Sequence, residues 1–169
     1  MLVFFDDILV YNKDWLTHHH LQLVFEVLCS YLLRSKCSFG QKSIGYLGHI
    51  VSAEGISMEP TKIEAILSGP IPRTLKASRG FLGLAGYYRK FIKNFREIAA
   101  SLMKLTKKDS FVRNSAAQEA FQALKHALSH PPVLAMPDFT KPFVVECDAL
   151  GRGLGAVWMR ERPVAFLRP

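Results

Sequence analysis

An acidic pair lies inside an apolar run at the start of the chain. Asp6 and Asp7 interrupt the sequence MLVFFDDILVY, which covers residues 1–11. Ionised carboxylates are costly in an apolar interior unless they are paired or ligated. The flanking β-branched, aromatic and aliphatic residues predict two short buried strands, with both acids at the hairpin turn between them. Two carboxylates held in one cleft are what a two-metal phosphoryl-transfer site needs, and an ordinary polar turn is the alternative.

The positive charge is concentrated in one stretch of the chain. The 169 residues carry a net charge of +8. The stretch from Arg73 to Arg113 contains eleven Lys and Arg residues and two acidic ones, so it carries +9 and the remainder of the chain −1. Such a concentration indicates a polyanionic partner, for which nucleic acid is the default, whereas a solvated helix face is the plainer interpretation.

Composition narrows the class of protein. With 49% hydrophobic residues the chain can bury a core, and it has no run of about 18 apolar residues that would span a membrane. The start lacks the basic region of a signal peptide. Three widely spaced cysteines, Cys29, Cys37 and Cys147, indicate reduced thiols. We therefore expect an intracellular protein of the cytoplasm or nucleus that is neither secreted nor bound to a membrane.

Periodicity predicts the order of helices and strands. A helix is expected over Asp14–Leu33, a hairpin over Ser43–Val51, and a helix that begins at Pro60 and ends before Gly69. A further helix is expected to bury one face, with Tyr87 also in the core. That face consists of Phe81, Leu84, Tyr88, Phe91, Ile92 and Phe95. The last third predicts a helix over Ala116–Leu128 and then two paired strands, Phe143–Asp148 and Leu154–Met159.

Several motifs follow one another in an order that resembles a known family. After FFDD they are KCSFG at 36–40, YLGHIVSAEGI at 46–56, EPTKIEAI at 59–66, FLGLAGYYRKFIKNF at 81–95, AFQALKHAL at 120–128, PVLAMPDFTKPF at 132–143 and ECDA at 146–149. Over essentially its whole length, the chain resembles the Pol polyprotein of gypsy-type long-terminal-repeat retrotransposons, where reverse transcriptase meets RNase H. The resemblance implies an α/β (α+β) fold in three segments. Residues 1–58 would end the reverse-transcriptase palm, 59–113 would form a helical thumb, and 114–169 would hold a connection helix and the first β-hairpin of an RNase H-like fold.

The resemblance also implies roles for individual residues. Asp6 and Asp7 would hold Mg²⁺, or Mn²⁺, for nucleotidyl transfer by an RNA-directed DNA polymerase, and Asp148 would hold it for RNase H cleavage. Tyr46, Leu47 and Gly48 would grip the primer strand, although a plain edge hairpin is the alternative. The backbone of an RNA/DNA template–primer duplex would contact a set of cations, namely Arg79, Arg89, Lys90, Lys93 and Arg96.

The chain also departs from the family pattern. We expect an upstream palm aspartate and the nucleotide-holding fingers to be missing, together with the acidic ligands of RNase H beyond Pro169. Cys147 and Leu150 stand where hydroxyl residues are usual, Arg113 where tryptophan is expected, and residues 166–169 (FLRP) deviate from the usual strand ending. We therefore expect the isolated chain to be inactive. The alternatives are a non-catalytic basic module that binds nucleic acid and an inert relic.

Overall fold

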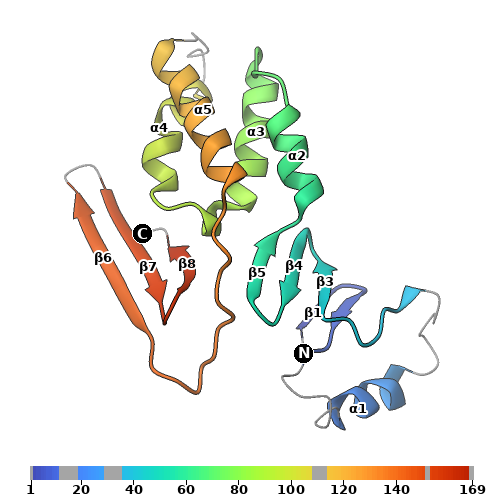
Figure 1. The fold of residues 1–169 in the computed structure, drawn as a ribbon. Helices are drawn as coiled ribbons and strands as arrows, with labels where there is room; N and C mark the ends of the chain where they lie inside the picture. The colour runs from blue at the N-terminus through green and yellow to red at the C-terminus, as the bar shows by residue number, and fades with distance from the viewer. Residues whose placement is uncertain (1, 12–18, 29–35, 108–113, 151–152, 168–169) are drawn as a thin grey trace. The chain divides into compact units, whose positions relative to one another are not determined.

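The chain is a mixed α/β protein built from small sheets and short helices, as its sequence predicts (Figure 1). The computed structural model describes residues 2–11, 19–28, 36–107, 114–150 and 153–167. Its contacts divide into two compact units, Met1–Ala53 and Glu54–Pro169.

The first unit begins with the acidic hairpin. Strands β1 (Leu2–Phe4) and β2 (Asp7–Leu9) pair antiparallel, with Phe4 opposite Asp7. The prediction that these strands are buried is wrong: Leu9 is buried, whereas Phe4 is 52% exposed and Phe5 87% exposed. A β-hairpin buries an apolar face only where another element covers it, and the described residues of the first unit leave Phe4 and Phe5 exposed.

A helix and a second hairpin complete the first unit. Helix α1 covers His19–Leu28, and the rest of the predicted Asp14–Leu33 helix lies outside the described residues. Leu21, Val24 and Phe25 are half-buried, which agrees with their helical spacing. The predicted second hairpin is confirmed as β3 (Ser43–Tyr46) paired antiparallel with β4 (His49–Ser52).

The second unit consists of one strand, a group of helices and a three-stranded sheet (Figure 1). Strand β5 (Gly55–Met58) leads into α2 (Pro60–Ser68), which begins at a proline and is followed by Gly69, as predicted. Next come α3 (Leu75–Tyr87), the short 3₁₀ helix η3 (Arg89–Phe91), α4 (Phe95–Leu105) and α5 (Ser115–Ser129). The antiparallel sheet has the order β6 (Val144–Leu150), β7 (Gly153–Met159), β8 (Pro163–Leu167).

The hydrophobic core of the second unit lies among its helices. Phe121, Leu124 and Leu128 line the inner face of α5 at helical spacing and are almost fully buried, as predicted. Lys125 ties α5 to the end of α2, because its Nζ donates to the Gly69 carbonyl oxygen at 2.9 Å. Side-chain caps fix the starts of two helices: Thr74 accepts from the amide of Ala77 at 3.1 Å, and Asn114 accepts from Ala117 at 2.9 Å.

The predicted helix through Phe81–Phe95 is in fact interrupted. Helix α3 ends at Tyr87, and Asn94 adopts a left-handed conformation (φ +56°) directly before α4. Asparagine tolerates this conformation better than most residues. At the end of α3, Tyr88 is 1% exposed while its neighbour Tyr87 is 53% exposed. The predicted burial is confirmed for Tyr88 and wrong for Tyr87 and Leu84, which is also exposed.

The predicted terminal hairpin is part of a larger sheet. Strands β6 and β7 pair as expected, and β8 adds a third strand that the sequence analysis missed. Val164 is buried and Phe166 packs against the helical core, so β8 joins the sheet to the helices of this unit. The two-residue spacing of Val164 and Phe166 was the available signal for this strand, whose sequence is PVAFL.

A backbone bridge ties β5 to the segment that follows α5. Ile56 and Leu134 exchange two hydrogen bonds, of 2.8 Å and 2.9 Å. The preceding Gly55 has φ +134°, and a Cβ there would lie 2.0 Å from the Leu134 oxygen, so this close approach requires glycine. Among the described residues, no helix is long and apolar enough to cross a membrane.

Candidate nucleic-acid and metal-binding residues

The two N-terminal aspartates lie at the tip of the β1–β2 hairpin. Phe5 and Asp6 form the turn, where Phe5 has φ +51°, and Asp7 is the first residue of β2. Both carboxylates are exposed. Carboxylate oxygens are the ligands that Mg²⁺ prefers, so the donor type fits a magnesium site. Two adjacent carboxylates are nevertheless fewer ligands than a pair of metal ions requires.

The structure brings two predicted functional segments of the first unit together. The Tyr46 hydroxyl donates a hydrogen bond to the main-chain oxygen of Asp7 at 3.4 Å. Tyr46 ends β3, and the next two residues, Leu47 and Gly48, form the turn with φ of +49° and +70°. Positive φ at both central positions is the type I′ hairpin geometry, which is unfavourable for leucine. Backbone strain of this kind is often found at ligand-binding segments.

The imidazole of His49 lies against the strained turn. His49 Nδ1 is 2.7 Å from the Leu47 carbonyl oxygen, and its side chain is buried. A protonated Nδ1 would donate to that oxygen and hold the turn in place. His49 was not singled out from the sequence, and its position directly after the turn is the signal that could have found it.

The third predicted metal ligand belongs to the second unit. Asp148 lies in β6 with its backbone opposite Gly155 of β7. Among the residues that the structure describes, no cluster of three or more His, Cys, Asp or Glu side chains could hold a metal ion. Residues 151 and 152, which separate β6 from β7, lie outside the described part of the chain.

Three of the five predicted duplex-contacting cations are exposed around the junction of η3 and α4. Arg89 lies in η3, Lys93 follows it, and Arg96 lies in the first turn of α4. Lys90 differs, because it is half-buried with its Nζ 5.4 Å from the centre of the Phe91 ring. Burial lowers the pKa of Lys90, since desolvation disfavours its charged form.

Arg79 is engaged elsewhere in the same unit. Its Nη2 donates to the carbonyl oxygen of Thr106 at 3.0 Å, just beyond the end of α4. A cation at this position satisfies a carbonyl group that the end of a helix leaves without an intrahelical partner. Arg79 thus has a structural contact that local sequence could not predict, because the two residues are far apart in the chain.

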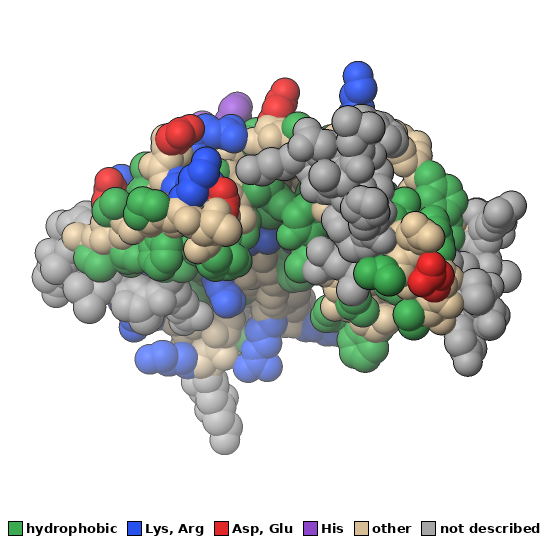
Figure 2. Space-filling model, turned by 90° about the horizontal axis from the view of Figure 1, so that it is seen from below, with side chains coloured by type: hydrophobic (Ala, Val, Ile, Leu, Met, Phe, Trp, Pro, Cys, Tyr) green, Lys and Arg blue, Asp and Glu red, His purple; other side chains and the backbone are tan. Residues whose placement is uncertain are grey.

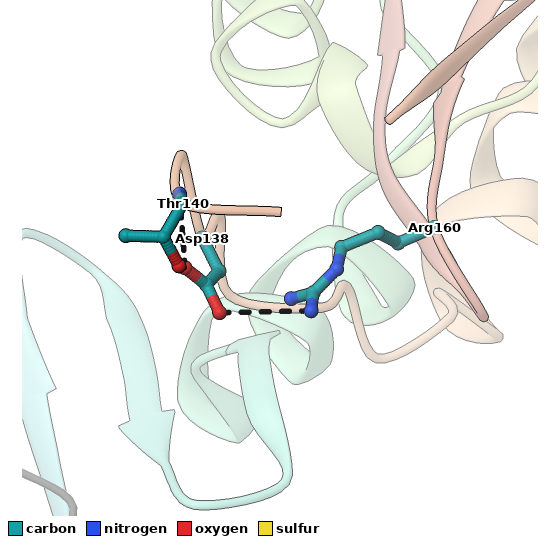
Figure 3. A network of polar contacts seen from close by, with 3 residues as sticks. All are labelled: Asp138, Thr140 and Arg160. Atoms are coloured by element: carbon teal, nitrogen blue, oxygen red, sulfur yellow. Dashed lines mark hydrogen bonds and ion pairs between the residues drawn. The ribbon is translucent and has the colours of Figure 1, made fainter. Parts of the chain in front are cut away.

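A polar network that the sequence analysis missed lies beside the sheet of the second unit (Figure 3). Asp138 Oδ2 lies 3.6 Å from Arg160 Nη2, at the end of β7. The amide and hydroxyl of Thr140 donate to Asp138 Oδ1 at 3.2 Å and 2.6 Å. The network ties the approach to β6 to the far end of β7. The spacing Asp-x-Thr, typical of a side-chain-stabilised turn, was the signal for it.

Three aromatic side chains contact one another in the same part of the chain. The Trp158 ring contacts Phe139 and Phe143, with ring centroids 5.8 Å and 5.4 Å away. Both phenylalanines are exposed. The space-filling view shows hydrophobic side chains at the surface beside charged ones (Figure 2).

Comparison with known proteins identifies the family. The family described as "RNase H-like domain found in reverse transcriptase" matches residues 114–169. The retrovirus-related Pol polyprotein from transposon 297 of Drosophila melanogaster is 40% identical over 98% of this chain. An uncharacterized mitochondrial protein of Arabidopsis thaliana is 47% identical over 75% of this chain, which covers 83% of that protein.

The chain belongs to the Pol polyproteins of gypsy-type retrotransposons. The Pol polyprotein from transposon gypsy itself is 35% identical over 98% of the chain. The chain spans 16% of the length of the transposon 297 polyprotein and 18% of the gypsy polyprotein.

Solved structures show the same fold for nearly the whole Pol segment. The foamy viral protease-reverse transcriptase, solved with double-stranded DNA, superimposes with a TM-score of 0.80 at 23% identity, over 93% of this chain and 30% of that chain. The same viral enzyme, solved with an RNA/DNA hybrid, gives 0.79 over 92% of this chain and 23% of that chain. The predicted fold class is thereby confirmed.

Proposed function

We propose that this chain is the part of a retrotransposon RNA-directed DNA polymerase with ribonuclease H that holds the RNA/DNA template–primer duplex. The exposed cations Arg89, Lys93 and Arg96 carry this proposal, because they lie within eight residues of one another. Their segment, residues 73–113, has a charge of +9, while the remainder of the chain carries −1. Phosphate backbones bind such a row of cations through electrostatics alone. The foamy viral protease-reverse transcriptase of the same fold was solved with double-stranded DNA and with an RNA/DNA hybrid, and this supports the choice of partner.

Within this proposal the chain also supplies metal ligands. Asp6 and Asp7 would hold Mg²⁺ or Mn²⁺ for nucleotidyl transfer, and Asp148 for cleavage of the RNA strand. A divalent ion held by these carboxylates would supply the Lewis-acid stabilisation that phosphoryl transfer needs. The remaining ligands would come from an upstream palm, and the fingers that hold the incoming nucleotide would be supplied separately. Tyr46, Leu47 and Gly48 would position the primer strand through the main chain of their turn.

The three-segment division belongs to the same proposal. Residues 1–58 would serve as palm, 59–113 as thumb, and 114–169 as the connection and start of RNase H, all within an intracellular protein. The contribution of Arg79 and Lys90 to duplex binding would be smaller than that of the other three cations, because Arg79 contacts Thr106 and Lys90 is half-buried.

A salt titration with matched variants tests the duplex proposal. Binding of a fluorescent RNA/DNA duplex is followed by anisotropy, and we expect log affinity to fall with log salt at a slope of about −4 to −5, for four to six phosphate contacts. Replacing Arg89, Lys93 and Arg96 with Gln should weaken binding to all sequences alike and flatten the slope by up to about three. The control replaces Lys42, Lys62 and Lys141, exposed residues outside the basic segment, with the same change of charge.

Each outcome of the titration separates the alternatives. A flattened slope in the first variant but not in the control supports the proposal. Equal effects of both variants would show that net charge alone drives binding. Binding that does not respond to salt, or that no variant weakens, would contradict the proposal and favour an inert relic.

A further inference from the structure

Two histidines lie at the end of helix α5, His126 in its last turn and His130 directly after it. His126 and His130 are four residues apart, and both imidazoles are exposed. Their ring centroids are 5.1 Å apart. Two imidazoles bound to one tetrahedral zinc ion have centroids about 5 Å apart, because each Zn–N bond is about 2.0–2.1 Å long. The separation of the two ring centroids matches this value.

A hydroxyl between the two histidines fixes the proton of the second ring. Ser129 Oγ is 2.7 Å from the His126 carbonyl oxygen and 2.8 Å from His130 Nδ1. The carbonyl can only accept, so the Ser129 hydroxyl proton is used there, and the Ser129 oxygen must accept from His130 Nδ1–H. This arrangement leaves the lone pair of His130 on Nε2, which is the form that binds a metal.

The same hydrogen bond serves as outer-sphere support. A histidine that binds a metal usually donates its other ring N–H to a neighbouring acceptor, which orients the ring. Ser129 supplies that acceptor for His130 before any ion arrives. The site also lies at the carboxyl end of a helix of fifteen residues, where the backbone dipole favours a cation.

We propose that His126 and His130 form a binding site for a divalent transition-metal ion of the kind that prefers imidazole, such as Zn²⁺. Because the described residues hold no cluster of three potential ligands, the two imidazoles are the protein ligands and water completes the coordination. Such a site clamps the last turn of α5, whose buried residues Leu124 and Leu128 belong to the core. It is separate in sequence from Asp6, Asp7 and Asp148, and it differs from them in ligand chemistry.

Calorimetric titration with ZnCl₂ in a phosphate-free buffer tests the site. We expect His126→Gln and His130→Gln each to weaken zinc binding at least 10-fold. Ser129→Ala, which removes only the acceptor for Nδ1, should weaken it about 10-fold. MgCl₂ should not compete, because Mg²⁺ prefers oxygen ligands. Zinc should raise the melting temperature of the wild type, and EDTA should reverse the rise.

Two controls keep the result interpretable. In EDTA, each single His variant should have the same melting temperature as the wild type, because both rings are exposed and removing one does not disturb the core. A variant with Gln at residues 18, 19 and 20 removes the other histidine-rich stretch and should bind zinc as the wild type does. Zinc affinity that survives both His126→Gln and His130→Gln, or that is lost only in the variant at 18–20, would overturn the proposal. The absence of measurable zinc binding by the wild type would overturn it too.

Discussion

The Tyr46 hydroxyl reaches the main-chain oxygen of Asp7, 3.4 Å away, across 39 positions of sequence. The contact links the second hairpin of the first unit to the strand that carries one of the proposed metal ligands. A hydrogen bond of this length, to a main-chain atom, positions Asp7 without touching its carboxylate. Tyr46 can therefore affect the acidic hairpin by fixing its backbone.

Tyr46→Phe tests this positioning role. We expect a loss of about 0.5 kcal/mol in local stability, since the bond is long and partly exposed to solvent. Amide exchange at Asp7 and Ile8 should become faster, while exchange in the second unit stays unchanged. Tyr11→Phe, at another exposed tyrosine of this unit, is the matched control. Unchanged exchange at Asp7 and Ile8 would show that the contact does not order the hairpin.

Leu47→Asn relieves the strain of the I′ turn. A left-handed conformation costs a residue with a Cβ about 1–2 kcal/mol, and asparagine pays less of this cost than leucine. We expect the variant to stabilise the β3–β4 hairpin by about 1 kcal/mol in amide-exchange measurements. Gly48→Ala, which adds a side chain at φ +70°, should do the opposite. Loss of stability in Leu47→Asn would mean that the leucine side chain, rather than the turn backbone, stabilises this hairpin.

The 169-residue chain should not catalyse DNA synthesis by itself. Asp6 and Asp7 offer two adjacent carboxylates, whereas two divalent ions require further ligands. Incorporation of deoxynucleotides on a primed template should therefore be undetectable. With an upstream palm and fingers supplied, activity should appear and should be abolished by Asp6→Asn or Asp7→Asn. Incorporation by the chain alone that Asp6→Asn removes would refute this prediction.

Exposed apolar side chains on the first hairpin should limit solubility. Phe4, Phe5 and Ile8 are all exposed, and uncovered apolar strands promote association. We expect residues 1–58 to unfold without a cooperative transition. Phe5→Lys should raise solubility more than Ser43→Lys, an exposed site that receives the same charge. Strong amide protection over residues 2–9, together with a sharp thermal transition, would contradict the expectation.

Two glycine substitutions should change stability in opposite directions. Gly55→Ala places a Cβ 2.0 Å from the Leu134 oxygen at φ +134°, so it should break the bridge between Ile56 and Leu134 at a cost of about 1–3 kcal/mol. Gly80→Ala lies inside α3 with open space around the new Cβ, and should stabilise by about 0.5–1 kcal/mol. Denaturant unfolding measures both. A neutral Gly55→Ala would show that the backbone there can move without loss.

Local patterns determined the features whose causes lie within a few residues of each other. Pro60 and Gly69 delimit α2, and the three-to-four-residue spacing of Phe121, Leu124 and Leu128 sets the buried face of α5. The order of the motifs was sufficient to place the chain in its family. In each case the information is short-ranged, or it is carried by a long ordered series of residues.

Only the tertiary structure decided which side chains remain available at the surface. Tyr87 and Tyr88 are neighbours in one apolar segment, yet the first is exposed and the second is buried. Arg79 and Lys90 look like other cations in the sequence, but one contacts Thr106 and the other lies over Phe91. The sequence of the first hairpin predicts buried strands, although Phe5 is exposed among the described residues. Burial, and contacts such as that between Arg79 and Thr106, depend on residues that are distant in sequence, so periodicity and charge along the chain cannot determine them.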